Sequence, residues 1–544
     1  MNTRQLQTDK NQKLYHALLG ILLVCALAMM MLLSYWACKY SYYGAVDGRT
    51  RGVLVGDKTW AHIAVFFAAS LCTMGIDKVL MKKDKSQQEK ICLCTLIVTS
   101  VIAFILGVFY VCKNPYYPVG DQINTTAFAA YCRDGNFSML SIGGYVGMYQ
   151  QQKGLAILYE ILFTLFGDFN YRPAKILHVV WWILTILAGY GFLKLNTDRP
   201  VFRMLYCVMM LGCFPLLFYL PYIYGDVLSI SFGIILFYGV AAYEHSGQKR
   251  YIALASFAAG LAVLARKNTW IVLVAVAVYV LLVSLRKKKV RYLMAGTAIL
   301  LTAALSVKAV DVIYEVRSGY PSGVGIPSIL WVAMGLQETE GRAGVYNRYQ
   351  QATFTDYDCQ QELAAQQGKE YIRERLEEFS QDPGMAFNFF KNKVEGQWIE
   401  PMYAALESTE SFEEGAELSP VLESLYYGEL GRTIWKLTNY YQSILYLAGL
   451  MALVMLGILW WKKKEVPISL WLPWIAVFGG FLFSILWEAK SRYVFPYCVF
   501  MILYAPEGLY QTGLLLCKLP KLRKFKKSGH TQDKGEEASL RETA

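Results

Sequence analysis

The stretch NPYYPVGDQINTTAFAAYCRDGNFSMLSIGGYVGMYQQQKG, residues 114–154, interrupts a chain that otherwise consists mainly of long apolar runs. It is polar, aromatic and rich in turn-forming residues. Near its start, Pro118 and Gly120 favour a turn that exposes the carboxylate of Asp121 directly after an apolar segment ends. An alternative is that Asp121 caps the helix that residues 123–128 begin, and one residue can serve both purposes.

The composition around this stretch is that of a membrane protein. Of 544 residues, 55% are hydrophobic and 17% are charged, which is not the balance of a soluble globular domain. The formal net charge of +12 is concentrated in short clusters beside apolar runs, where Lys and Arg report orientation in a membrane. The lipid bilayer is therefore an expected partner, and nucleic acid is not. The clusters are Lys82 to Lys85, Arg286 to Lys289, Lys462 to Lys464 and Lys518 to Lys527.

Twelve apolar segments approach the length of about 20 residues that a helix needs to cross the hydrocarbon. The first begins near Leu14, is too long for a signal-peptide core and lacks a small-residue cleavage pattern, so we interpret it as a retained span. The sequence thus predicts an all-α polytopic membrane protein with about 12 transmembrane helices. The segments are 15–38, 60–80, 91–112, 176–194, 203–221, 226–243, 251–265, 270–285, 292–311, 440–461, 467–487 and 494–516.

Alternation of these spans places two long hydrophilic segments on the same side of the membrane. If the N-terminus is inside, the basic loops and the basic tail also fall inside, as the positive-inside rule requires. We therefore expect a multi-pass protein of the plasma membrane, with cytoplasmic N- and C-termini and two extracytoplasmic loops. The predicted divisions are an N-terminal transmembrane module (1–312) with a first external loop (113–175), a large extracytoplasmic loop domain (313–438), C-terminal transmembrane helices (439–517) and a basic cytoplasmic tail (518–544).

Both external loops contain segments with a predicted conformation. Residues 362–379 predict a helix within the large loop, and the acidic and aromatic residues around it favour an ordered domain. In the first loop, residues 154–163 predict an amphipathic helix lying in the membrane interface, with a short thirteenth span as the alternative. Cys132 and Cys359 are the cysteines that fall clearly in these loops, and a disulfide between them is left open.

Charged residues gather at the outer ends of several spans. Asp226 lies in a tight turn between two spans, where its alternative role is again that of a helix cap. Arg266 and Lys267 occupy an outer turn against the positive-inside trend, and snorkelling to lipid phosphates is the alternative to a phosphate-binding role. The stretch Trp487-Glu488-Ala489-Lys490-Ser491-Arg492-Tyr493 again places cations outside.

Outer carboxylates beside outer cations suit the transfer of a sugar from a lipid-linked phosphate. Such a reaction needs a general base for the acceptor hydroxyl and a cationic site for the phosphate that leaves with the lipid. We expect Asp121 and Asp226 to be catalytic; the two could share a divalent metal ion, although no motif demands one. The expected phosphate ligands are Arg492, Arg266, Lys267, Lys490 and Tyr493, and the expected acceptor contacts are Gln151, Trp398 and Tyr403, with ordinary loop core as the alternative for Trp398 and Tyr403.

The order of the short motifs resembles that of the GT-C superfamily of polytopic glycosyltransferases, and most closely the bacterial branch related to family 39 and the protein mannosyltransferases. The motifs are Gly120-Asp121-Gln122, Tyr149 to Gly154, Tyr224-Gly225-Asp226-Val227 and Ser491-Arg492-Tyr493-Val494-Phe495-Pro496. The resemblance implies a GT-C-like fold, with Asp121 as catalytic base and with Arg492 and Tyr493 at the polyprenyl phosphate. Gln122 stands where family 39 commonly has Glu, which separates this chain from a strict protein O-mannosyltransferase.

The expected function is therefore inverting transfer of a sugar from a polyprenyl-phosphate donor to an extracytoplasmic acceptor in the cell envelope, whether glycan, lipid or protein. One alternative is a secondary transporter, which would place ionisable residues near the middle of the membrane. Another is a polysaccharide polymerase or ligase that uses a polyprenyl-diphosphate glycan. That enzyme should have a distal loop rich in Arg and His, whereas the large loop here is mainly acidic and lacks His.

Overall fold

The computed structural model describes residues 3–43, 53–287, 289–323, 325–464 and 466–518. Within these ranges, nine helices are long and apolar enough to cross a membrane, which agrees with an all-α polytopic membrane protein. They belong to α1 (Thr3–Lys39), α2 (Thr59–Leu80), α3 (Lys85–Lys113), α7 (Arg172–Asn196), α10 (Asp226–Ser246), η3 with α12 (Lys267–Thr269, Trp270–Lys287), α13 (Val290–Ser318), α20 (Glu429–Trp461) and η4 with α21 (Ile468–Trp471, Leu472–Leu486).

The remaining three segments predicted as spans are helical but short or broken. Residues 203–221 form two helices, α8 (Pro200–Leu211) and α9 (Phe214–Phe218). The break between them lies just before Pro215, which has no backbone N–H to donate. Residues 251–265 lie in α11 (Lys249–Ala265), which has 17 residues. Residues 494–516 form α22 (Ser491–Met501) and a second helix over 505–518. By length and composition, the described chain therefore provides nine full spans where twelve were expected.

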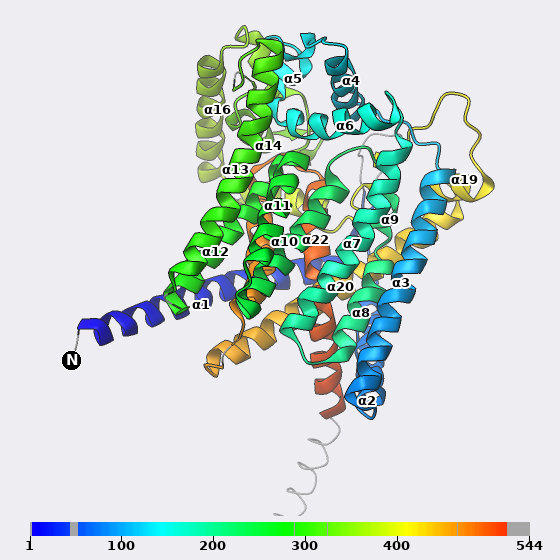
Figure 1. The fold of residues 1–544 in the computed structure, drawn as a ribbon, viewed down its shortest axis with the longest axis vertical. Coiled ribbons are helices and arrows are strands. Elements are labelled where there is room, and N and C mark those ends of the chain that lie inside the picture. Colours follow the sequence, from blue (N-terminus) through cyan, green and yellow to red (C-terminus); the bar gives the residue numbers. More distant parts are fainter. Residues whose placement is uncertain (1–2, 44–52, 288, 324, 465, 519–544) are drawn as a thin grey trace, which may run out of the picture.

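The first external loop folds into short helices at one end of the bundle, at the top of Figure 1. These are α4 (Asp121–Arg133), η1 (Ser138–Leu140), α5 (Tyr145–Met148), η2 (Gln150–Gln152) and α6 (Lys153–Phe166). At 14 residues, α6 is too short for the thirteenth span considered above. Its Glu160 is turned to the protein, where it accepts bonds from Arg317 (2.6 Å) and Tyr314 (3.2 Å) of α13.

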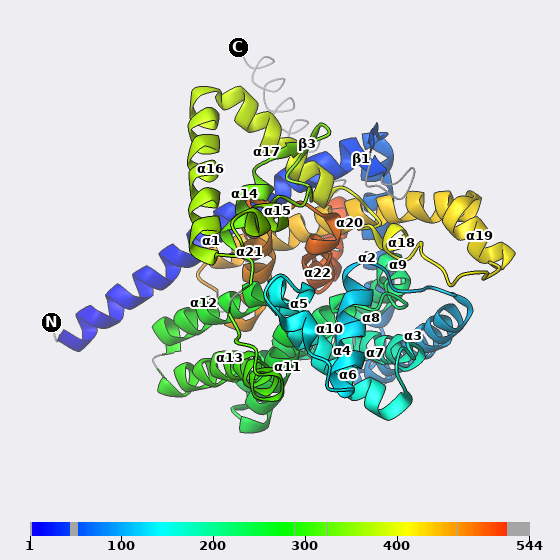
Figure 2. The same ribbon diagram turned by 90° about the horizontal axis from the view of Figure 1, so that it is seen from above.

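The large loop lies at the same end, which faces the viewer in Figure 2, and we call this end the loop end. Its helices are α14 (Ile329–Gly335), α15 (Tyr349–Asp356), α16 (Gln361–Gln381), α17 (Pro383–Trp398), α18 (Ala405–Ser408) and α19 (Pro420–Tyr427), and α16 confirms the helix predicted over 362–379. The antiparallel pair β3 (Glu338–Thr339) with β4 (Arg342–Ala343) belongs to this loop. A second antiparallel pair, β1 (Tyr40–Tyr43) with β2 (Val53–Gly56), comes from between α1 and α2 and joins the loop through a hydrogen bond of 3.0 Å from Tyr42 N–H to the carbonyl of Ile399. A bridge between Tyr116 and Phe412 joins the two external loops.

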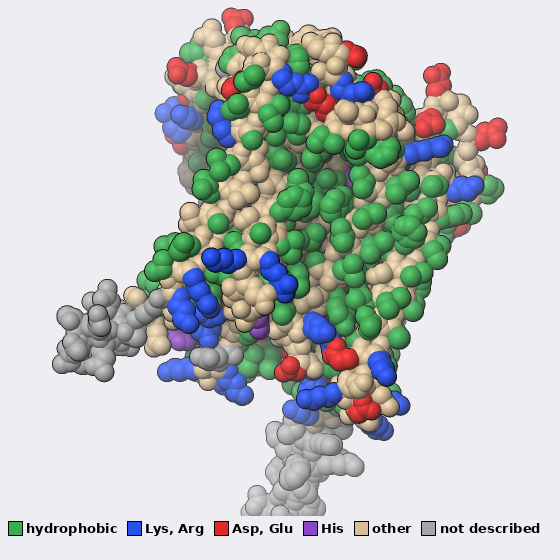
Figure 3. Space-filling model, in the orientation of Figure 1, with side chains coloured by type: hydrophobic (Ala, Val, Ile, Leu, Met, Phe, Trp, Pro, Cys, Tyr) green, Lys and Arg blue, Asp and Glu red, His purple; other side chains and the backbone are tan. Residues whose placement is uncertain are grey.

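The surface is divided along the long axis of the molecule. Figure 3 shows a broad hydrophobic band between the loop end and an opposite end where Lys and Arg gather, which we call the basic end. Exposed side chains of α3 such as Ile105 and Phe109 contribute to the apolar surface. This distribution suits a bilayer around the middle of the bundle. The open question of a disulfide is answered as well, because Cys132 and Cys359 are both free thiols.

Candidate functional site

Asp121 begins α4, and its position depends on the turn before it. Gly120 has a φ of 58°, in the left-handed region that glycine adopts without strain. The N-cap position of α4 is occupied by Gly120 and Asp121 is the first helical residue, so the capping alternative does not describe Asp121. Its Oδ1 instead accepts a hydrogen bond of 2.8 Å from the hydroxyl of Tyr145. Burial, together with the charge of Asp121, raises the pKa of Tyr145 far above its ordinary value, so Tyr145 stays a donor.

Asp226 begins α10 in a similar Gly-Asp sequence but has a different partner. A Cβ on Gly225 would lie 2.0 Å from the carbonyl oxygen of Ala265, so only glycine allows this close approach. The approach brings Asp226 Oδ2 to 2.6 Å from Arg266 Nη1 in an ion pair in which Asp226 is buried and the Arg266 side chain is 11% exposed. Here too there is no side-chain cap. Because its Oδ2 accepts from the guanidinium, the geometry suits Asp226 for orienting Arg266, and its catalytic role stays a prediction.

Two arginines from distant parts of the chain share the same aromatic rings. The guanidinium carbon of Arg492 lies 5.2, 5.4 and 5.5 Å from the ring centroids of Tyr222, Tyr224 and Tyr493. The guanidinium carbon of Arg266 lies 5.1 and 5.5 Å from the ring centroids of Tyr224 and Tyr493. The predicted grouping of these two cations with Tyr493 is therefore found in the structure.

Arg492 has no anionic partner in the described part of the chain. It is 5% exposed, its Nε has no hydrogen-bond partner, and neither an ion pair nor a hydrogen bond of its side chain is found among the described residues. A buried guanidinium without a counter-ion is costly unless an anion binds to it. Beside it lies a narrow cavity of about 20 Å³, walled by Asp226, Arg266, Arg492 and Tyr493 and, farther along, by Pro496 and Phe500. We call this cavity the arginine slot.

Glu488 faces the same region from the turn before α22. It is 7% exposed, and burial raises its pKa to about 7; Lys490 opposes that rise and Asp121 adds to it. The hydroxyl of Tyr493 lies 3.4 Å from Glu488 Oε1. The sequence analysis quoted Glu488 without giving it a role, although an acidic residue two positions before an outer lysine is a signal that could have been used.

A large cavity of about 950 Å³ adjoins Glu488 within the loop end. It lies between the two hairpins, α17 and the segment before α22, and Tyr346 and Lys490 also line it. Lys490 has no ion pair within the described ranges. Burial raises the pKa of two further lining carboxyls, Glu400 and Glu407, so both hold a proton to a higher pH than an exposed carboxyl does.

The two aromatic residues expected at the acceptor lie in the protein core instead. Trp398 is 0% exposed and donates from Nε1 to Ser484 Oγ at 3.0 Å. Tyr403 is also buried, and its hydroxyl accepts a bond of 2.8 Å from Gln442. Neither side chain has free surface for a sugar, so the core alternative describes both residues. The chain turns inward here because Tyr403 and Ala404 have positive φ values of 50° and 56°.

Lys267 and Gln151 are not part of the arginine slot. Arg266 has an extended backbone, so the next side chain points away, and Lys267 donates to Ser328 Oγ at 3.2 Å. Gln152, not Gln151, reaches the tyrosines, donating to the hydroxyl of Tyr224 at 2.6 Å. Lys267 and Gln151 meet in another cavity.

No group of three or more His, Cys, Asp and Glu side chains able to hold a metal ion occurs among the described residues. Asp121 and Asp226, considered above as a shared metal site, are instead bound to Tyr145 and Arg266. Comparisons of the chain with protein-family models, with curated proteins and with solved structures find no match. The argument about function therefore depends on the geometry of the site.

Proposed function

We propose that this protein is a membrane glycosyltransferase that moves a sugar from a polyprenyl-phosphate donor to an extracytoplasmic acceptor. The observation that carries the proposal is Arg492, a buried cation without an anion in the described chain, beside Arg266 in a slot that Pro496 and Phe500 also line. At about 20 Å³ the slot holds little more than a water, so it must widen to admit a phosphate. A lipid phosphate has the matching anionic head and apolar tail. Arg also suits bidentate contact with phosphate oxygens.

Asp121 supplies the second requirement of the reaction, a base near the phosphate site. Its helix α4 is linked to the site through Thr125, whose hydroxyl donates to Gln152 Oε1 at 3.3 Å, while Gln152 donates to the hydroxyl of Tyr224 at 2.6 Å. In the proposed step, the acceptor oxygen attacks the anomeric carbon of the sugar while the bond from that carbon to the phosphate oxygen breaks. The acceptor proton passes to Asp121, and the arginines stabilise the charge that develops on the departing lipid phosphate. A single displacement of this kind inverts the anomeric centre.

The large cavity is the proposed entrance for the acceptor, because Glu488 and Lys490 in its wall adjoin the tyrosines of the slot. In this proposal the fold is GT-C-like, the three short or broken helices complete twelve crossings, and the loop end faces out of the plasma membrane. Both termini are then cytoplasmic. The identity of the sugar is set by the shape of the pocket.

The test uses the full chain in proteoliposomes with a panel of radiolabelled polyprenyl-phosphate hexoses and pentoses and a crude envelope extract as acceptor. Release of polyprenyl phosphate is measured for the wild type, Asp121→Asn and the matched control Asp134→Asn. Asp134 is an exposed carboxylate at the other end of α4. We expect Asp121→Asn to lower turnover by about 10²- to 10⁴-fold, the usual contribution of a general base, and Asp134→Asn to leave it unchanged.

Full turnover in a well-inserted Asp121→Asn variant would show that Asp121 is not the base. An absence of turnover in the wild type with every donor would count against the whole proposal. In that case counterflow of substrates in vesicles would test the transporter alternative, and polyprenyl-diphosphate glycans would test the polymerase or ligase alternative.

A further inference from the structure

A second cavity, of about 280 Å³, lies where α6 meets the ends of α11, α12 and α13. Its wall includes Lys267 and Gln151. The sequence predicted both residues at the reaction site, but the structure places them in this cavity. None of its lining residues belongs to the arginine slot. We call it the lateral cavity.

The polar half of the lateral cavity carries an excess of positive charge. Lys153 is buried, forms an ion pair with Asp311 and donates to Ser322 Oγ at 2.8 Å, so its charge is compensated. Lys267 has only the Ser328 hydroxyl as a partner within the described ranges. The side chain of Gln151, which is half-buried in the same wall, makes no hydrogen bond in the described structure. An ammonium group and an amide donor are thus available to an anion.

The other half of the lateral cavity is apolar and reaches the molecular surface. It is formed by Val263 and Leu264 of α11, Trp270 of α12, and Val307 and Val310 of α13. Trp270 is 37% exposed and stands in the first turn of α12, the position that tryptophan favours at the boundary between water and hydrocarbon. The cavity therefore opens where lipid headgroups meet the bilayer.

We infer that the lateral cavity is a binding site for the phosphate headgroup of a membrane lipid, separate from the donor site. Lys267 Nζ and the Gln151 amide would contact phosphate oxygens, and the lipid chain would leave past Trp270 along α12 and α13. The inference does not depend on glycosyl transfer, because it requires only an anionic head attached to an apolar tail.

Native mass spectrometry of the delipidated full chain in detergent tests the inference with three probes. These are dioleoyl phosphatidic acid, dioleoylglycerol, which lacks the phosphate, and inorganic phosphate, which lacks the tail. We expect one phosphatidic acid per chain, bound about tenfold more weakly by Lys267→Gln, as the loss of one charge-assisted hydrogen bond predicts. Lys267→Arg should keep the affinity, and Gln151→Phe, which fills the cavity without removing an internal bond, should lower it.

Two control variants separate this site from others. Lys308→Gln removes an exposed cation of α13 that does not line the cavity, and it should bind as the wild type does. Arg492→Met removes one cation from the arginine slot. This variant should still bind the lipid, although it loses glycosyl transfer. Equal binding by Lys267→Gln and the wild type would overturn the inference. So would equal binding of dioleoylglycerol, displacement of the lipid by inorganic phosphate at the same concentration, or loss of the lipid in Arg492→Met but not in Lys267→Gln.

Discussion

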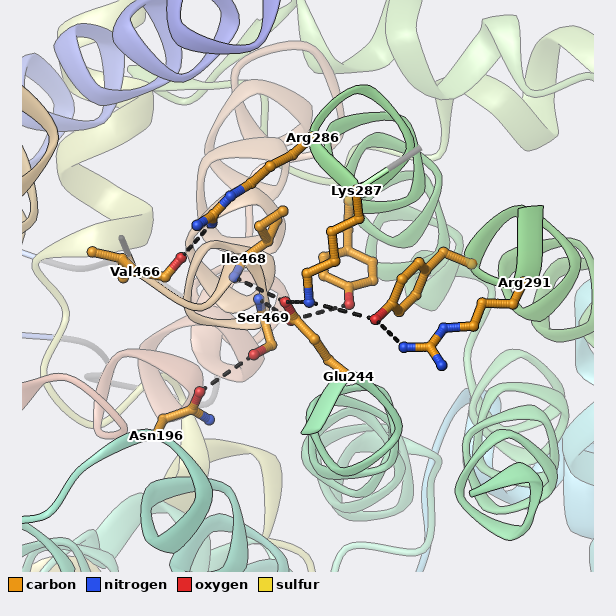
Figure 4. Close-up of polar contacts among 10 residues, drawn as sticks. Asn196, Glu244, Arg286, Lys287, Arg291, Val466, Ile468 and Ser469 are labelled. Atoms are coloured by element: carbon orange, nitrogen blue, oxygen red, sulfur yellow. Dashed lines mark hydrogen bonds and ion pairs between the residues drawn. The ribbon is translucent and has the colours of Figure 1, made fainter. Parts of the chain in front are cut away.

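Buried charges and tyrosines occur at both ends of the bundle, and they are used in opposite ways. At the basic end, the carboxylate of Glu244 in α10 accepts hydrogen bonds from Lys287 (2.8 Å), Tyr279 (3.2 Å) and the backbone N–H of Ser469 (2.8 Å) (Figure 4). At the loop end, Arg492 has three aromatic neighbours and no anion in the described chain.

The difference separates a structural role from a functional one. The Glu244 cluster connects α10, α12 and η4, and its polar groups find their partners within the protein. Such a cluster stabilises the packing of helices and offers nothing to a ligand. The arginine slot retains a charge that the protein does not neutralise, and that charge is the feature that points to a bound anion.

Arg492→Met gives the largest expected effect. The change removes the phosphate contact but fills the same space with an apolar side chain, so transfer should fall by about 100-fold or more while the melting temperature stays the same or rises. Donor turnover and thermal unfolding in detergent measure the two quantities. A lower melting temperature with unchanged turnover would mean that Arg492 is a structural residue, as Glu244 is.

Glu244→Ala should lower stability and leave donor binding unchanged, which is the opposite of the result expected for Arg492→Met. It leaves Lys287 without its carboxylate and removes the acceptor for the backbone of Ser469, which should cost about 2–4 kcal/mol of stability. Denaturant titration in micelles measures the loss. Donor binding by the protein that remains folded should match the wild type, and a selective loss of donor affinity at full stability would contradict the structural role.

Glu488→Gln tests how the charge of Glu488 at the loop end affects stability as the pH changes. Because the pKa of Glu488 in the folded protein, about 7, exceeds the ordinary carboxyl value, its stabilising contribution is full below the unfolded-state pKa and is lost as pH rises through 7. The Gln variant stays neutral and does not lose this stabilising contribution. Glu488→Gln should therefore match the wild type near pH 4.5 and exceed its stability by about 1–3 kcal/mol at pH 8. Melting curves of the variant and the wild type at pH 4.5 and pH 8 measure the two differences in stability. An equal difference at both pH values would exclude titration of Glu488 as the cause.

Trp398→Phe should have the smallest effect. The variant keeps most of the buried ring and loses the hydrogen bond to Ser484, at a cost of about 1 kcal/mol. Because Trp398 lies in the core, the KM for the acceptor should not change. A large rise in that KM without loss of stability would restore Trp398 to the acceptor site.

The all-α membrane fold could be predicted from the sequence because long apolar runs favour spans. The closeness of Arg266 and Arg492 could be predicted because charges at span ends collect on one face by alternation, and the functional roles of Asp121 and these two arginines stay predictions. The direction of neighbouring side chains could not be predicted. The extended backbone at Arg266 sends Lys267 into another cavity, and the tight turn of η2 brings Gln152 to Tyr224 in place of Gln151.

Burial within the loops was left open by the sequence, which allowed Trp398 and Tyr403 either an acceptor contact or a place in the loop core. A linear pattern does not show which loop residues pack inward, and the structure buries both side chains. The count of twelve spans stays a prediction where helices are short or broken, as they are just before Pro215. Glu488 was overlooked because its significance comes from burial near Asp121, which a linear pattern does not contain.

The stacking of two arginines on Tyr224 and Tyr493 has a practical consequence for identifying the ligand. Asp226 neutralises one of the two guanidinium groups, so an anion that enters the slot meets a site with uncompensated charge and binds the folded state alone. At a concentration one hundred times its Kd, such a ligand stabilises the folded protein by about 2.7 kcal/mol. A shift of a few degrees in melting temperature would then single out the natural phosphate from a library of envelope lipids before any reaction is known.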